Sequence, residues 1–139
     1  MSPRIAPSDD LHTCLALRQL VFVAEQGVPF EEEADEYDAT ASHFLAWDGP
    51  APVATARVVY DDNIAKIGRV CVLPSHRGKG LGAALIRAAL EHIRARGVPL
   101  ARLGAQVQAI GFYEGLGFHV VSGEYDDAGI AHVDMERRP

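Results

Sequence analysis

A glycine-spaced stretch at residues 77–82 constrains the fold of this chain more than any other feature. It reads Arg-Gly-Lys-Gly-Leu-Gly, after an apolar run that stops at Pro74 and before a helical pattern that continues to residue 96. Because glycine has no side chain, backbone N–H groups can close around an anion there, and the following helix start adds unpaired donors. Arg77 can meet phosphate oxygens in a bidentate way, and Lys79 can meet them as a point charge. The stretch therefore predicts a strand–loop–helix unit that holds a diphosphate.

Other interpretations of this loop fit the sequence less well. The phosphate-loop spacing G-x-x-x-x-G-K-[ST] is absent from the sequence. Residues 78–83 formally fit the dinucleotide fingerprint G-x-G-x-x-A, but that motif expects an acid about 20 residues later. Residues 98–103 contain no acid. A glycine-rich turn without a ligand stays open as an interpretation, but it gives Arg77 and Lys79 no role.

Apolar periodicity and turn residues predict the order of the elements. Residues 11–22 repeat apolar side chains at helical spacing, with Ser8 as the expected N-cap and with Gly27 and Pro29 at the end. The other expected helices are 79–96 and 109–116, and the expected strands are 4–6, 43–47, 53–60, 64–73, 100–105, 118–122 and 130–136. Three of these strands, spanning residues 43–73, should form an antiparallel meander. Because a helix joins them, strands 64–73 and 100–105 should be parallel.

Two motifs resemble one enzyme family. Residues 77–82 are similar to the acetyl-CoA pyrophosphate loop of the GNAT N-acetyltransferase superfamily, [QR]-x-x-G-x-[GA]. Residues 106–118 resemble its second signature, N-x-x-A-x-x-[FL]-Y-x-x-x-G-F, with Gln106 where asparagine is usual. The matching positions there are Ala109, Phe112, Tyr113, Gly117 and Phe118. Residues 17–29 with the acids after them, residues 103–106 and residues 129–132 resemble the ElaA-like subgroup, so the resemblance spans nearly the whole chain.

The resemblance implies a single GNAT domain over residues 1–139, with an α/β fold. Its sheet is mixed and mostly antiparallel, its central parallel strand pair splays apart, and helices cover both faces. The pantetheine arm of acetyl-CoA would enter the gap and pair with strand backbone near Val70 and Val72. The implied cofactor-binding residues are Val70, Cys71, Val72, Arg77, Gly78, Lys79, Gly80, Leu81, Gly82, Ala83, Gln106, Ala109, Phe112 and Tyr113.

Direct acetyl transfer to an amine needs groups that handle charge and protons. Tyr113 is the expected acid for the departing thiolate, and the backbone N–H of Val72 is the expected oxyanion donor. Because a free alkylamine is almost entirely protonated at pH 7, some base must take its proton. Glu25 is the first candidate for this base. His132 is another group that could accept a proton at neutral pH.

An acidic run at residues 31–38 contains all of the excess negative charge. The net charge is −6, and the run has six acids and no base, so the rest of the chain has 13 acids and 13 bases. Such a run is either a solvated loop or a set of carboxylates that attracts a cationic amine. Glu33, Asp35 and Asp38, with His132, are the candidate substrate-binding residues. Carboxylates that attract an ammonium also oppose its deprotonation, so recruitment and base catalysis can belong to different residues.

Several functional classes are disfavoured by the sequence. A nucleic-acid binder needs a basic surface, and no apolar stretch approaches the roughly 20 residues that span a bilayer. Cys14 and Cys71 do not make a disulfide framework, and the spacing of histidines and cysteines predicts no metal site. We therefore expect a cytoplasmic protein with no membrane or nucleic-acid partner, and a homodimer is an expectation from related folds.

The expected function is an acetyl-CoA-dependent N-acetyltransferase. Its acceptor would be a primary amine, in a small cationic metabolite such as a polyamine or amino sugar, attacked directly in a ternary complex. Two alternatives stay open. One is a non-catalytic acyl-CoA-binding sensor or interaction module, and the other is an acetyltransferase for protein or peptide amines.

Overall fold

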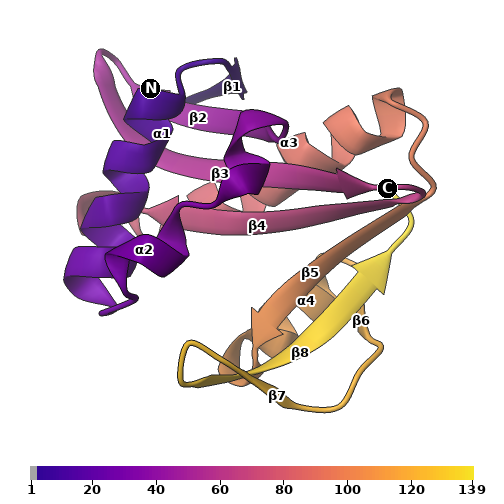
Figure 1. Cartoon of the computed structure of the whole chain (residues 1–139). Coiled ribbons are helices and arrows are strands. Elements are labelled where there is room, and N and C mark those ends of the chain that lie inside the picture. Colours follow the sequence, from indigo (N-terminus) through magenta and orange to yellow (C-terminus); the bar gives the residue numbers. More distant parts are fainter. Residues whose placement is uncertain (1–2) are drawn as a thin grey trace.

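The computed structural model describes residues 3–139, and its centre is one mixed sheet of eight strands. The strand order is β1-β2-β3-β4-β5-β8-β6, and β7 pairs with β8 beside this path (Figure 1). The strands are β1 (Arg4–Ser8), β2 (Ser42–Asp48), β3 (Ala51–Asp61), β4 (Ile64–Val72), β5 (Leu100–Gln106), β6 (His119–Val120), β7 (Tyr125–Asp127) and β8 (Ile130–Arg137). Only β4 and β5 are parallel neighbours, and all the other described pairs are antiparallel.

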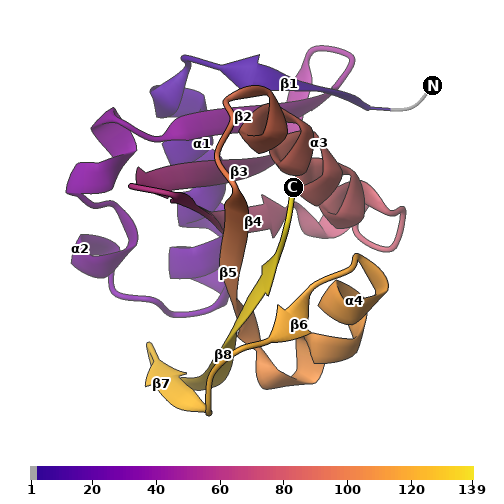
Figure 2. The ribbon, with the colours of Figure 1, turned by 90° about the vertical axis from the view of Figure 1, so that its right-hand side faces the viewer.

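Helices cover both faces of the sheet. The N-terminal helix lies on one face and α3 lies on the other, as Figure 2 shows. The helical elements are α1 (Leu11–Arg18), the π-helix η1 (Gln19–Glu25), α2 (Phe30–Glu33), the 3₁₀ turns η2 (Glu36–Ala39), η3 (Pro74–His76) and η4 (Val107–Ala109), α3 (Leu81–Ala95) and α4 (Ile110–Gly115). None of the helices in residues 3–139 has the length and apolar character that crossing a bilayer requires.

Strand alternation divides the core between these two faces. Phe44 and Ala46 of β2 pack in the cluster beneath α3, whereas Leu45 between them packs with Cys14 and Leu17 of α1. Successive side chains of a strand point to opposite faces, so β2 is buried on both sides. The larger cluster, beneath α3, also contains Leu85, Ile86, Ala89 and Ile93 of that helix, each fully buried. This spacing follows one face of the helix, as its sequence period predicts.

The fold class expected from the sequence is confirmed. Strands β2, β3 and β4 form the predicted antiparallel meander, and β4 and β5 are parallel with α3 between them. The parallel pairing runs only from Ile64↔Leu100 to Ile67↔Leu103, although both strands continue beyond these residues. The two strands therefore diverge, which is the V-shaped opening between β4 and β5 in Figure 1.

A bulge in β4 accompanies the divergence. The register with β3 shifts between Thr55↔Cys71 and Arg57↔Gly68, so Arg69 and Val70 together face one residue of β3. Arg69 has a φ of 50°, which is uncommon for a residue with a side chain. Bulges bend a strand and turn its side chains, and here the bend lies where β5 separates.

Three local predictions are wrong. Ser8 ends β1, and Asp10 caps α1 instead by accepting a hydrogen bond from the Thr13 N–H at 3.1 Å. The predicted N-terminal α-helix changes to π-helical winding at Gln19, and Leu20, expected on its apolar face, is 57% exposed. The predicted strand 118–122 shortens to His119–Val120, because β6 pairs with β8 at only those two residues.

The packing of α3 predicts a large cost for losing one of its core side chains. Leu85→Ala should lower the free energy of unfolding by about 2–5 kcal/mol, because Leu85 is fully buried between helix and sheet. Arg87→Ala, on the exposed side of the same helix, should change it by less than about 0.5 kcal/mol. Urea unfolding followed by circular dichroism measures both, and equal effects would contradict the placement of α3.

Candidate active site

A cavity of about 350 Å³ opens where β4 and β5 diverge. Its walls come from η1, α2 and the segment between them, from β4 at its bulge, from β5, from η4 and α4, and from the β7–β8 hairpin. The lining residues are Phe22, Gln26, Val28, Glu33, Ile67, Gly68, Arg69, Val70, Leu103, Gly104, Gln106, Ala109, Tyr113, Asp127, Ala128, Ile130 and His132. The cavity thus brings together residues from both halves of the chain.

The glycine-spaced loop forms an open cradle at the start of α3. Gly78 and Gly80 have φ values of 76° and 78°, which glycine adopts without strain. A Cβ atom added at Gly78, Gly80 or Gly82 would have no heavy atom within 4 Å, so open space lies beside the backbone at all three positions. The first intrahelical bond runs from the Ala84 N–H to the Gly80 carbonyl, so the preceding N–H groups have no partner within the helix. This arrangement fits a diphosphate anion.

Arg77 is held by two neighbours in this structure. Its two terminal nitrogens donate to the two carboxylate oxygens of Glu25, each at 2.7 Å, and its Nε donates to the Val72 carbonyl at 2.9 Å. The hydrogen bonds from Arg77 lower the pKa of Glu25, which weakens it as a base. Glu25 also does not line the cavity. These facts revise the expectation that Glu25 is the first candidate for the base.

The open edge of β4 lies at Val70 and Val72. The Leu73 N–H donates to the Val53 carbonyl on β3, and backbone groups alternate along a strand, so the Val72 N–H points away from β3. That side is the one from which β5 has departed. Cys71 points to the α1 face, where burial raises the pKa of its thiol to about 12, so it is not a thiolate at neutral pH.

Tyr113 lines the cavity from α4, together with Gln106 and Ala109. Its ring packs edge-on against Phe112 and Phe118, at centroid distances of 5.0 and 6.2 Å. Burial raises the pKa of the Tyr113 phenol, so the hydroxyl keeps its proton at neutral pH. Phe112 is 48% exposed and is not among the lining residues, so its predicted contact with the cofactor stays a prediction.

His132 enters the cavity from β8 with a defined orientation. Its Nδ1 lies 2.8 Å from the Ile130 carbonyl oxygen, which can only accept, so Nδ1 has the proton of the neutral ring. The other nitrogen, Nε2, then has a lone pair. The ring stacks on Tyr125 at 6.0 Å and 25°, and the Tyr125 hydroxyl donates to Asp134 at 2.6 Å. His132 is therefore positioned to accept a proton at Nε2.

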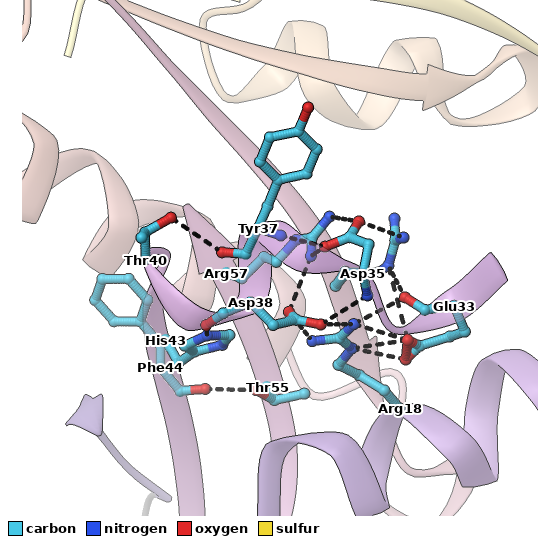
Figure 3. A network of polar contacts seen from close by, with 11 residues as sticks. Arg18, Glu33, Asp35, Tyr37, Asp38, Thr40, His43, Phe44, Thr55 and Arg57 are labelled. Carbon is cyan, nitrogen blue, oxygen red and sulfur yellow. Dashed lines mark hydrogen bonds and ion pairs between the residues drawn. The ribbon is translucent and has the colours of Figure 1, made fainter. Parts of the chain in front are cut away.

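The acidic run folds into a buried ion network (Figure 3). The Arg18 guanidinium, 1% exposed, donates to Glu33 at 2.7 Å and to Asp38 at 2.7 Å. Arg57 donates to Asp35 at 2.6 Å and to Asp38 at 2.9 Å. Burial by itself would raise the pKa of Asp38, but hydrogen bonds from Arg18, the Asp35 N–H and Arg57 outweigh burial and hold that pKa far below its usual range.

The solvated-loop interpretation is therefore wrong for Glu33 and Asp38, which are 4% and 6% exposed. Arg69 completes the network: its Nε donates to the Glu33 carbonyl at 3.1 Å and its Nη2 to Asp35 at 3.4 Å. Three arginines thus face three of the acids, and the side chain of Glu32 lies outside the described part. The role of these acids in substrate binding stays a prediction, but their charges are already balanced by guanidinium groups.

Sequence reasoning missed the basic half of this network. Arg18, Arg57 and Arg69 are 15 to 36 residues from their partners, and no motif links them. One signal was available, because Arg18 directly follows Leu17 within a stretch of apolar helical residues. A guanidinium at such a place needs a buried carboxylate.

Comparisons with known proteins agree with this geometry. Residues 19–139 match the acetyltransferase (GNAT) domain family. YjcF of Bacillus subtilis (strain 168), named an uncharacterized N-acetyltransferase, is 39% identical over 128 residues, which span 91% of each chain. Protein ElaA of Escherichia coli (strain K12) is 35% identical over 135 residues, which span 91% of this chain and 86% of ElaA.

Solved structures share the fold over nearly its full length. An acyl-CoA N-acyltransferase from Pseudomonas aeruginosa has a TM-score of 0.90 at 30% identity, covering 98% of this chain and 99% of that one. The crystal structure of Escherichia coli ElaA has a TM-score of 0.86 at 31% identity, covering 97% and 99%. A more distant GNAT acetyltransferase from Elizabethkingia anophelis, determined with acetyl-CoA bound, has a TM-score of 0.76 at 13% identity and covers 99% of both chains.

The buried network predicts a specific loss of stability. Asp38→Asn should lower the free energy of unfolding by about 3–5 kcal/mol, because it leaves Arg18 and Arg57 partly unpaired in the interior. Asp38 has a lowered pKa, so its contribution is present above its unfolded pKa of about 4 and is lost as the pH falls below that value. Unfolding curves from pH 7 to 3 should therefore show a smaller pH dependence for the variant.

Glu91→Gln is the matched control, since Glu91 forms an exposed ion pair with Arg94 on α3. Its effect should stay within about 1 kcal/mol. If the two variants lost the same stability, the charges around Asp38 would not be buried in solution.

Proposed function

The chain belongs to the GNAT acetyltransferase family, and we propose that it transfers an acetyl group from acetyl-CoA to a primary amine of a small cationic metabolite by direct attack in a ternary complex. The observation on which the proposal rests is the placement of His132 and Tyr113 in one cavity, which is also lined by β4, the strand that leads to the glycine cradle. His132 offers a proton acceptor, and Tyr113 offers a proton donor. A single domain over residues 1–139, a cytoplasmic location and a homodimer stay predictions.

The cradle and the open edge of β4 would hold the acetyl donor. Acetyl-CoA supplies an activated acetyl group as a thioester. The backbone N–H groups of Gly78 to Ala83 and the Lys79 ammonium would bind the diphosphate. The Arg77 guanidinium is paired with Glu25 in this structure, so it would bind the diphosphate only where that ion pair separates. Backbone groups at Val70 would pair with the pantetheine amides, while the Val72 carbonyl accepts from Arg77 and the Val72 N–H stays available for the acetyl group.

His132 would prepare the acceptor. An alkylammonium has a pKa near 10.4, so only about one molecule in 10³ is neutral at pH 7. Nε2 of His132 takes a proton from the ammonium, directly or through one water, and Nδ1 keeps its hydrogen bond to the Ile130 carbonyl. The neutral nitrogen then attacks the acetyl carbonyl, and holding both reactants in one cavity contributes about 7–11 kcal/mol.

Tyr113 would complete the transfer. Its phenol donates a proton to the sulfur as the carbon–sulfur bond breaks, so a neutral thiol leaves. The attacking nitrogen loses a second proton as the amide forms, and this proton restores the phenol through water. The Val72 N–H, which points to the opened side of β4, is the proposed donor to the carbonyl oxygen.

Tyr113→Phe should slow transfer about 10²-fold or more and leave acetyl-CoA affinity nearly unchanged, because only the proton donor is removed. Burial raises the pKa of Tyr113 above its ordinary value of 10, so the wild-type enzyme should keep this acid protonated and active through about pH 9. Free thiol release with a set of amines measures kcat, and calorimetry measures cofactor binding.

Tyr37→Phe is the control, because Tyr37 is 51% exposed and does not line the cavity. A wild-type kcat in Tyr113→Phe would contradict the proposed acid. Tight cofactor binding without thiol release from any amine would instead favour the sensor hypothesis.

Gly82→Val should weaken acetyl-CoA binding by about tenfold or more, because its side chain would stand beside the N–H groups that bind the diphosphate. The backbone of Gly82 is not in the left-handed region, and valine is a better helix residue than glycine, so the fold should persist. Gly123→Val, also with open space at its Cβ, is the control on a distant loop. Calorimetric affinities that match in all three proteins would mean that the diphosphate binds elsewhere.

A further inference from the structure

We infer that Asp127, at the β7–β8 turn, binds a second positive charge of the acceptor, so that the substrate is an amine with another cationic group besides the one that reacts. This inference rests on the proposed function, because it concerns the acceptor of the same cavity. It assigns a residue outside both sequence motifs. It also moves the recruitment of the substrate away from the acidic run at residues 31–38.

The charges that line the cavity leave Asp127 uncompensated. Four titratable or charged residues other than Tyr113 line it: Glu33, Arg69, Asp127 and His132. Glu33 is buried and receives Arg18 at 2.7 Å, and Arg69 faces Asp35 and the Glu33 carbonyl. Within residues 3–139, by contrast, no hydrogen bond or ion pair reaches the carboxylate of Asp127. It is exposed, so a ligand in the cavity can approach it.

The β7–β8 hairpin sets where this carboxylate points. The register pairs Tyr125 with His132 and Asp127 with Ile130. Side chains two apart share a face, so Asp127 lies on the same face as His132, which is its diagonal neighbour. Diagonal neighbours across an antiparallel pair are roughly 7–8 Å apart, a span that one small molecule can bridge.

The turn holds Asp127 firmly at the end of its strand. Ala128 and Gly129 have φ values of 54° and 82°, and two positive values are typical of a type I′ two-residue hairpin turn. The neighbouring acid, Asp126, points to the opposite face and accepts a hydrogen bond from the Gly129 N–H at 3.3 Å. Asp126 is therefore a structural residue of the turn, whereas Asp127 faces the cavity.

Charge and proton chemistry require two separate positive groups. A carboxylate that binds an ammonium stabilises its charge and so opposes the loss of its proton. If Asp127 held the reacting nitrogen, it would work against His132. The two residues cooperate when Asp127 holds one cationic group and His132 Nε2 takes the proton from another. A diamine has the chemistry that this pair of residues fits.

The test compares 1,4-diaminobutane with butylamine as acceptors. Wild-type kcat/KM should be about tenfold or more higher for the diamine, the size expected for a hydrogen bond between charged groups. Asp127→Asn should remove most of this preference, and added salt should reduce it in the wild type. Asp126→Asn, which changes the same charge one residue away, should keep the wild-type preference.

Two outcomes would overturn the inference: equal kcat/KM for both amines in the wild type, or an unchanged preference in Asp127→Asn. Absence of thiol release with either amine would count against the proposed function instead. In that case calorimetry of 1,4-diaminobutane with the coenzyme A complex still decides the role of Asp127. Weaker diamine binding in Asp127→Asn than in Asp126→Asn would support it, and equal binding would refute it.

Discussion

Only four residue pairs hold β4 and β5 together, from Ile64↔Leu100 to Ile67↔Leu103. Beyond them, each strand has backbone groups on its inner edge that lack the usual neighbour, and such groups need a partner or water. A bulge at Arg69 bends β4 at this point, so the separation of β4 from β5 coincides with a specific irregularity of the β4 backbone. The cavity, the open edge at Val70 and Val72 and the approach to the glycine cradle all depend on this early end of the parallel pairing.

The ion network around Arg18 contributes two residues, Glu33 and Arg69, to the wall of the cavity. It connects α1, α2, η2, β3 and the β4 bulge through buried and partly buried guanidinium and carboxylate groups. The free-energy penalty for desolvating these charges offsets much of their electrostatic attraction, so the network adds little net stability. Because each arginine donates to two or more acceptors, however, few other arrangements of these side chains would satisfy the same hydrogen bonds. We interpret the network as the interaction that fixes α1, α2 and the β4 bulge relative to one another.

Two residues of the β7–β8 hairpin, Asp127 and His132, line the cavity together with Glu33 and Arg69 of the ion network. Glu33, Asp35 and Asp38 of the acidic run pair with arginines, and Glu33 is the member of this set that lines the cavity. Asp127 is exposed on the β7–β8 turn, and His132 has a lone pair directed by its hydrogen bond to Ile130. The proposed mechanism thus assigns the binding of charge and the acceptance of a proton to different residues, which avoids the conflict that a single carboxylate would create.

The sequence by itself determined the strand–loop–helix unit at residues 64–96, the meander, the parallel strand and the position of Tyr113 in its motif. These features depend on local spacing, on glycine conformations and on apolar periodicity, which a chain shows without its fold. Tertiary structure alone decided that Glu25 pairs with Arg77, that Arg18 and Arg57 pair with three acids of the run 31–38, and that Asp127 and His132 share a face. The partners in each of the two ion pairings lie at least 15 residues apart, and the shared face depends on hairpin register, so these contacts follow from how elements pack rather than from any residue's neighbours in the chain.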